Sequence, residues 1–146
     1  CHSVMDSMAQ AFAFYDFDET AMRLVYTPGQ VQPKYLINSD NFKPGYVTPN
    51  DAWENRMRLP GKNTFLGWDP NLQGSGSGAK SLGQELAASD AFAQCQVEKV
   101  FRAVCFRSPV DADDRGQVTA SVSSFKAAGN LKRVFAETAA YCSRNE

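Results

Sequence analysis

The spacing of apolar positions divides the chain into two parts of different character. Residues 79–142 contain four stretches whose apolar side chains recur at helical spacing, namely 81–89, 89–105, 118–128 and 130–142. A period of 3.6 residues predicts amphipathic helices for these stretches. Ser89, Asp90 and Asn130 are residue types that cap helix N-termini, and Gly129 is suited to end a helix. The second half is therefore predicted to be a helical bundle.

The first 73 residues follow a less regular pattern. Residues 1–14 are rich in Met, Ala and Phe and predict a helix, which the acidic run that follows interrupts. Four prolines between positions 26 and 50 predict a long ordered loop, with one short strand at 35–37. Asn50 and Asp51 are suited to cap a short helix that runs to Arg58. This half is therefore predicted to consist mainly of loops.

The run Gly74–Gly78 alternates glycine and serine and predicts a flexible connector. The predicted organisation is a loop-rich portion at 1–73, the connector at 74–78 and a C-terminal helical portion at 79–146. The length of 146 residues indicates that these parts form one compact, mainly α unit.

Charge and hydropathy exclude two classes of partner. The net charge is −1, so no broad positive field attracts nucleic acid. No apolar run approaches the length that a membrane-spanning helix needs. We therefore expect neither nucleic-acid binding nor a membrane span.

The four cysteines are Cys1, Cys95, Cys105 and Cys142. Cys95 and Cys105 are predicted to share one helix, in which ten residues span about 15 Å. That separation is too long for a disulfide, so a bridge among the last three cysteines includes Cys142. Either partner for Cys142 stays open, although the helical wheel favours Cys105. A bridge would indicate an oxidising compartment, whereas three unpaired thiols would indicate the cytosol.

The chain opens on Cys1-His2, and His2 is its single histidine. These are the last two positions of the C-x-x-C-H motif that attaches c-type haem. The stretch that follows resembles the planctomycete-type family of secreted cytochrome c-like proteins, whose segment reads C-H-x-x-M-D, then Phe, Phe-Asp and Arg. The second half resembles the C-terminal helical module of the same family. The matching residues at the start are Cys1, His2, Met5, Asp6, Phe12, Phe17, Asp18 and Arg23.

The resemblance implies a class I cytochrome c-like haem-binding portion with long loops, joined to a C-terminal helical bundle. It is also similar to the mono-haem domain that ends some redox proteins of plant-wall-degrading bacteria. It implies haem c attached through Cys1 and a first cysteine preceding it, with iron ligated by His2. Ala11 stands where the family has Gly, and the middle of the chain does not match.

The sixth iron ligand is expected to be a methionine, the usual partner of histidine in cytochromes c. Met5 and Met8 share a helix with His2 and lie on its side of the ring. Met57 is far enough along the chain to approach from the other side, and Met22 is the second choice. The macrocycle of the haem needs apolar side chains around it, and the predicted ones are Phe12, Phe17, Trp53 and Trp68, called the sleeve here. Arg23 is the predicted partner of a haem propionate.

The sequence predicts a periplasmic or secreted mono-haem domain that transfers single electrons and is not an enzyme. Its partner would be a redox protein or another domain of the same polypeptide. The alternative is an exported lipoprotein or partner-binding helical module with a lipidated Cys1 and no haem. A hydrolase using Asp16, Asp18 and Glu19 is the third hypothesis, but the chain lacks a nucleophile motif.

Overall fold

The computed structural model describes residues 2–37, 45–62 and 64–144, and it is mainly helical, as predicted. Contacts divide it into two compact units, Cys1–Leu86 (unit 1) and Ala87–Glu146 (unit 2). The α-helices are α1 (His2–Ala9), α2 (Pro33–Leu36), α3 (Gly78–Ala87), α4 (Asp90–Cys105), α5 (Ala112–Ala128) and α6 (Leu131–Cys142). The strands are β1 (Tyr15–Asp18), β2 (Arg23–Tyr26), β3 (Ala52–Glu54) and β4 (Ser75–Ser77), and the 3₁₀ helices are η1 (Gln10–Phe12), η2 (Arg56–Arg58) and η3 (Thr64–Leu66). Across the described residues, no helix is both long and apolar enough to cross a membrane.

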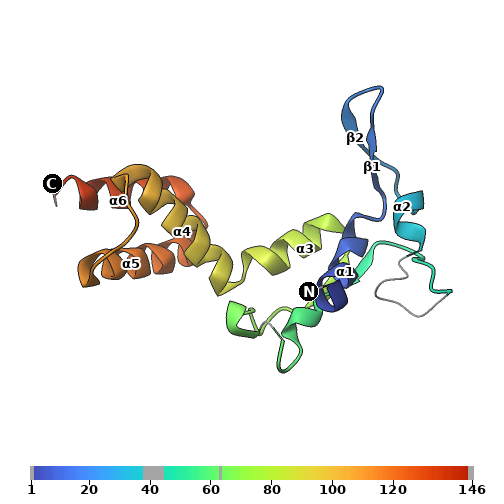
Figure 1. Cartoon of the computed structure of the whole chain (residues 1–146), viewed down its shortest axis with the longest axis horizontal. Helices are drawn as coiled ribbons and strands as arrows, with labels where there is room; N and C mark the ends of the chain where they lie inside the picture. Colours follow the sequence, from blue (N-terminus) through green and yellow to red (C-terminus); the bar gives the residue numbers. More distant parts are fainter. Residues whose placement is uncertain (1, 38–44, 63, 145–146) are drawn as a thin grey trace. The chain divides into compact units, whose positions relative to one another are not determined.

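Unit 2 is built from α4, α5 and α6, each of which packs against the other two (Figure 1). Its buried core consists of Val97, Val100, Phe101, Val118 and Val134. The three residues of α4 recur at helical spacing, and α5 and α6 each bury one valine against them, so the bundle forms by burying one side of each helix against the other two. The predicted helices of this half are confirmed, except that α5 begins at Ala112 rather than at 118, because the Asp111 side chain caps it by accepting the Asp114 N–H.

The helix ends in unit 2 follow the predicted signals. The side chains of Ser89 and Asn130 accept hydrogen bonds from the backbone N–H groups of Phe92 and Arg133, which caps α4 and α6. Gly129 ends α5 with φ of 60°, in the left-handed region that glycine adopts without strain. Local capping chemistry therefore determines where these helices begin and end.

The disulfide of unit 2 joins Cys105 to Cys142, whose Cα atoms are 5.6 Å apart. Each cysteine is the last residue of its helix, so the bridge ties the C-terminal ends of α4 and α6 together. This is the pairing that the helical wheel favoured. Cys95 is a free, exposed thiol.

In unit 1 the acidic run after α1 forms a β-hairpin that the sequence pattern did not predict. Strands β1 and β2 pair in antiparallel register, and the Asp18 carboxylate accepts the N–H groups of Thr20 and Ala21 in the turn. Directly opposed residues share a face of the hairpin, so one face is apolar and the other mostly polar. The apolar pairs are Tyr15–Tyr26 and Phe17–Leu24, and the opposite pairs are Asp16–Val25 and Asp18–Arg23.

Two expectations for residues 26–58 are wrong. Residues 33–36 form the short helix α2, and no strand occurs at 35–37. The expected helix from Asn50 to Arg58 is replaced by β3 and η2, because the Asn50 side chain accepts the Ala52 N–H in a local turn and β3 then pairs with β4. Residues 38–44 of the predicted loop lie outside the described residues.

The Gly/Ser run at 74–78, expected to be a flexible connector, contributes strand β4. Trp53 of β3 pairs with Gly76 of β4, and this residue is only 4% exposed, packed with Ala11 and Leu82. The Trp53 indole N–H donates to Ser81 Oγ at 2.8 Å. This packing holds α3 within unit 1, so the unit boundary falls after Leu86 rather than at the Gly/Ser run.

Gly76 is expected to be intolerant of any side chain. A Cβ there would lie 2.8 Å from Ser81 Oγ and 3.1 Å from the Trp53 ring. We expect Gly76→Ala to destabilise unit 1 by about 1–3 kcal/mol, because overpacking must displace the buried indole. Denaturant unfolding followed by tryptophan fluorescence measures the change.

Gly83→Ala is the matched control, since a Cβ at this position in α3 meets nothing within 4 Å. Alanine restricts the unfolded chain and favours the helix, so this variant should be more stable by about 0.5–1 kcal/mol. Equal effects from the two substitutions would contradict the packing described for Gly76.

Candidate functional site

The predicted haem-attachment pair lies at the beginning of α1. Cys1 is outside the described residues, and His2 is the first residue of the helix. Helix α1 packs against β3 and η2, and Ser7 Oγ donates to the Glu54 carbonyl oxygen at 2.7 Å. The helix that His2 opens is therefore fixed against the segment that contains Met57.

The two candidate methionine ligands differ in their surroundings. Met57 is partly buried at the centre of η2, and its backbone N–H donates to the Asn55 side-chain oxygen at 3.1 Å. Met22 lies in the hairpin turn with φ of 50° and is 74% exposed. Of the two, Met57 is the one held in a packed segment that contacts α1.

The structure does not gather the predicted sleeve residues into one group. Phe12 follows α1 and contacts the Tyr15 ring edge-on, and Phe17 lies on the apolar face of the hairpin; both are nearly half exposed. Trp53 is buried against α3, so packing with this helix already occupies its ring. Trp68 is partly exposed, with the Arg58 guanidinium 5.8 Å from its ring centre.

Arg23, the predicted propionate partner, is the exposed first residue of β2 and lies opposite Asp18. Its guanidinium is on the mostly polar face of the hairpin, whereas Phe17 is on the apolar face. The hairpin therefore presents these two predicted site residues in opposite directions.

A buried carboxylate that the sequence pattern did not indicate binds the residues on either side of Met57 in the segment 55–58. Glu85 of α3 has a side chain only 3% exposed, and it accepts hydrogen bonds from Arg58 and Asn55. Arg58 uses both Nε and Nη2, at 2.7 and 2.9 Å, in a bidentate contact. Asn55 Nδ2 donates to the same carboxylate at 2.7 Å. No periodic or motif signal in the sequence connects residues 55, 58 and 85.

The charges of this cluster are balanced. Burial alone would raise the pKa of Glu85, but the hydrogen bonds from Arg58 and Asn55 outweigh burial and lower the pKa below its ordinary value of 4.5. The same hydrogen bond from Arg58 raises the pKa of the guanidinium. Glu85 and Arg58 are therefore an ion pair at neutral pH.

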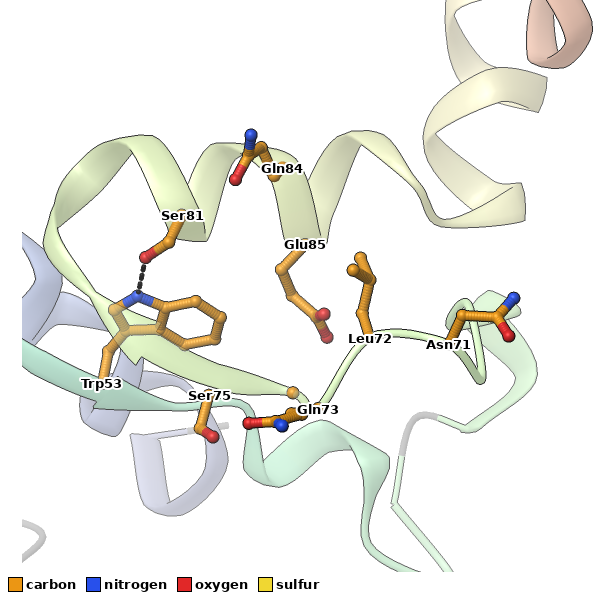
Figure 2. A pocket seen from close by; sticks show the side chains of 9 residues that line it. Trp53, Asn71, Leu72, Gln73, Ser75, Ser81, Gln84 and Glu85 are labelled. Atoms are coloured by element: carbon orange, nitrogen blue, oxygen red, sulfur yellow. Dashed lines mark hydrogen bonds between the residues drawn. The ribbon is translucent and has the colours of Figure 1, made fainter.

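A small cavity opens beside this carboxylate, between α3 and residues 71–75. Figure 2 shows Glu85 pointing from α3 toward this segment, between Trp53 and Leu72, while Gln84 points away. The cavity volume is about 220 Å³, below the ~300–1,000 Å³ of typical small-molecule pockets. It does not have the size of a haem pocket.

A metal ion bound directly by side chains and a haem iron require different sets of protein ligands. The described residues contain no group of three or more His, Cys, Asp or Glu side chains that could hold a metal ion. A haem needs only two axial protein ligands, and the pair of imidazole and thioether is the one that cytochromes c use. The chain has these two residue types at His2 and Met57, so the donor chemistry fits a haem iron, whereas the predicted sleeve residues are not gathered around one space.

Comparison with family models, with curated proteins and with solved structures finds no match for this chain.

Proposed function

We propose that unit 1 is a mono-haem c-type cytochrome domain that transfers single electrons, with iron held by His2 and Met57. One observation carries the proposal: α1 begins at His2, directly after Cys1, and packs against the 3₁₀ helix that contains Met57. Haem c, when bound, supplies the reversible one-electron chemistry of its iron. The residues that would hold the haem are Cys1, through a thioether bond, and His2 and Met57, through the iron.

The exposed apolar face of the β1–β2 hairpin is compatible with contact to a large apolar cofactor. Phe17 and Leu24 lie opposite each other on this face, and a porphyrin against them would remove both from water. The exposed large apolar residues of this unit include Met5, Phe12, Phe17, Met22, Leu24, Tyr26, Ile37, Val47, Leu59 and Phe65.

The resemblance to secreted cytochrome c-like proteins supports an exported location and a redox partner. The proposed domain is periplasmic or secreted, and it exchanges electrons with a redox protein or another domain of the same polypeptide. The Cys105–Cys142 disulfide is compatible with an oxidising compartment. Arg23 is proposed to pair with a haem propionate, whereas Phe12, Phe17, Trp53 and Trp68 do not form a common sleeve in the folded chain.

A second candidate is a partner-binding module of an exported lipoprotein, with lipid on Cys1. The exposed apolar face of the β1–β2 hairpin favours it, because a protein partner would cover Phe17 and Leu24 as well as a haem would. The two candidates differ in colour and in the mass carried by Cys1.

The test is haem incorporation in an exporting bacterium that has a c-type maturation system. The chain is produced as it stands and, in parallel, with a cysteine placed three positions before Cys1 to complete the attachment motif. We expect a red protein whose Soret band shifts on reduction and whose mass includes one covalent haem. His2→Ala should abolish the low-spin spectrum, because the iron loses its imidazole.

The methionine ligand is tested in the same preparation. Met57→Ala should convert the low-spin spectrum to high spin, while Met22→Ala should leave it unchanged. The reverse result would transfer the ligand role to Met22. A colourless protein in both preparations, with a lipid mass on Cys1 or none, would exclude the cytochrome.

A further inference from the structure

The residues on both sides of Met57 donate hydrogen bonds to one carboxylate, that of Glu85. Asn55, two residues before Met57, and Arg58, the residue after it, both donate to Glu85. Asn55 in turn accepts the Met57 backbone N–H through its side-chain oxygen. Glu85 is thus connected to Met57 through both of its neighbours, although it lies 28 residues further along the chain.

Further hydrogen bonds complete this attachment. The Asn55 N–H donates to the Gly74 carbonyl oxygen at 2.7 Å, and Arg58 Nη2 donates to the Asp69 carbonyl oxygen at 2.9 Å. A Cβ on Gly74 would lie 2.4 Å from Arg58 Cδ, so the backbone there packs closely on the arginine. The segment is therefore held by α3 and by the chain that leads into β4.

Stability alone is a poor explanation for a buried ion pair. Removing two charges from water costs as much as their attraction returns, so well-packed apolar residues often replace such a pair without loss. What an ion pair of this kind provides is a defined geometry, because the bidentate fork of arginine fits a carboxylate in one orientation. The cluster therefore specifies the position of η2.

A methionine ligand needs such positioning from its surroundings. Its side chain has several rotatable bonds and no strong directional contact of its own. A ligand is held in place by the groups that pack around it and hydrogen-bond to its segment. Met57 lies between Asn55 and Arg58, which both bind Glu85. These hydrogen bonds therefore restrict the position of the Met57 backbone, from which its side chain extends.

We propose that Glu85 is a positioning residue for Met57: the Glu85–Asn55–Arg58 cluster holds η2 so that the thioether is presented in one orientation toward the iron. The inference rests on the proposed function for the ligand role of Met57. The positioning itself is a property of this chain and can be measured without haem.

The first measurement uses the haem-free chain with ¹³C-methyl-labelled methionine. Four methyl signals are expected from the four methionines, and Met57→Leu identifies the relevant one. Glu85→Gln replaces one carboxylate oxygen with an NH₂ group. The glutamine can therefore not accept all the hydrogen bonds that Arg58 and Asn55 donate to Glu85. We expect the Met57 methyl signal to move to the position of a freely rotating methionine.

Glu137→Gln is the matched control. Glu137 of α6 also accepts from an arginine, Arg133, at 2.7 Å, and from Ser124 at 3.0 Å, but it belongs to unit 2. This variant should leave the Met57 methyl signal in place. Arg58→Lys keeps the charge but loses the bidentate fork, so it serves as a second variant if Glu85→Gln does not fold.

The second measurement uses the haem-loaded protein. Glu85→Gln is expected to weaken the low-spin methionine signature and to lower the reduction potential, because a displaced thioether no longer stabilises the reduced iron. A variant that only lowered thermal stability would leave both unchanged. Unchanged potential and an unmoved Met57 methyl signal in Glu85→Gln and Arg58→Lys would overturn the positioning role.

Failure of the proposed function gives a different result. If the chain binds no haem, yet Glu85→Gln still releases the Met57 methyl group, the ligand role is lost and the positioning of Met57 by Glu85 stands. If haem binds and Met57→Ala leaves its spectrum unchanged, the positioning role for an iron ligand is overturned.

Discussion

Replacing Asp114 by alanine is expected to lower the thermal midpoint of unit 2 by more than about 10 °C. Asp114 is fully buried at the N-terminal end of α5. Its carboxylate accepts hydrogen bonds from two nitrogens of Arg107, from the Val110 N–H and from the Tyr141 hydroxyl. The substitution leaves all these donors without their acceptor, which is among the most destabilising changes a protein undergoes.

Asp114 matters to unit 2 because its partners come from different segments. Arg107 and Val110 belong to the connection between α4 and α5, and Tyr141 is near the end of α6. The Tyr141 ring also packs on Phe101 of the core, with ring centres 6.1 Å apart. One carboxylate therefore joins the connection and two helices, so its loss should weaken the whole bundle.

The effect of the substitution should depend on pH in a defined direction. The hydrogen bonds from Arg107 lower the pKa of Asp114 well below its ordinary value of 3.8, against the opposing effect of burial. The stabilisation is therefore complete above this ordinary pKa and is lost as the pH falls below it, toward the depressed value. Thermal unfolding of wild type and Asp114→Ala should differ most near neutral pH and converge in strong acid.

Asp113→Ala is the control for this experiment, since Asp113 is exposed in the same first turn of α5. Its carboxylate contributes only a favourable interaction with the helix dipole, so a shift of a few degrees at most is expected. A loss as large as that of Asp114→Ala would show that charge at the helix terminus, rather than the buried network, explains the result.

Removing the Cys105–Cys142 disulfide is expected to destabilise unit 2 by about 4 kcal/mol in the chain-entropy account. The bridge closes a loop with a sequence separation of 37 residues, and opening it gives the unfolded chain more freedom. Cys105→Ser with Cys142→Ser, compared with wild type by denaturant unfolding, measures the difference. The change should appear in the midpoint, and reduction of wild type should reproduce it.

Cys95→Ser controls for the loss of a thiol, because Cys95 is free and exposed on α4. Its substitution should change the free energy of unfolding by less than about 0.5 kcal/mol. If reduced and oxidised wild type unfold at the same denaturant concentration, the bridge does not stabilise the bundle.

The helices of unit 2 could be predicted because each is specified by neighbouring residues. A stripe such as Val97, Val100 and Phe101 appears in the sequence at the spacing of the helix it forms. Caps such as Ser89 and Asn130 act on backbone groups three residues away. The same helical geometry favoured Cys105 over Cys95 as the partner of Cys142 without excluding Cys95, and the structure has the favoured pairing.

Strands β3 and β4 of unit 1 could not be predicted in this way. Residues 52–54 form a strand because residues 75–77 pair with them, and the intervening chain must first fold back. The Gly/Ser run resembles a linker by composition, yet Gly76 is required where the backbone crosses Trp53. Only a partner distant in sequence decides these conformations.

For the candidate site too, some features are visible in the sequence and others appear only in the structure. The Cys1-His2 pair and the candidate methionines are visible as residue types, and they remain the basis of the proposed haem ligation. The packing of η2, which contains Met57, against α1 and the hydrogen bonds from Asn55 and Arg58 to Glu85 appear only in the folded chain. A buried carboxylate cannot be distinguished from a surface one in a polar stretch of sequence.

The sequence by itself determined the interactions that act over a few residues: the four helices of the second half, their caps and the geometry that favours one disulfide. The tertiary structure decided the interactions between distant residues: the pairing of β3 with β4, the burial of Trp53 and the Glu85 cluster beside Met57. The physical reason is the distance in sequence between the residues that interact. A helix forms its hydrogen bonds and its apolar stripe within a few turns, whereas a strand or a buried ion pair is specified by a partner that folding brings to it.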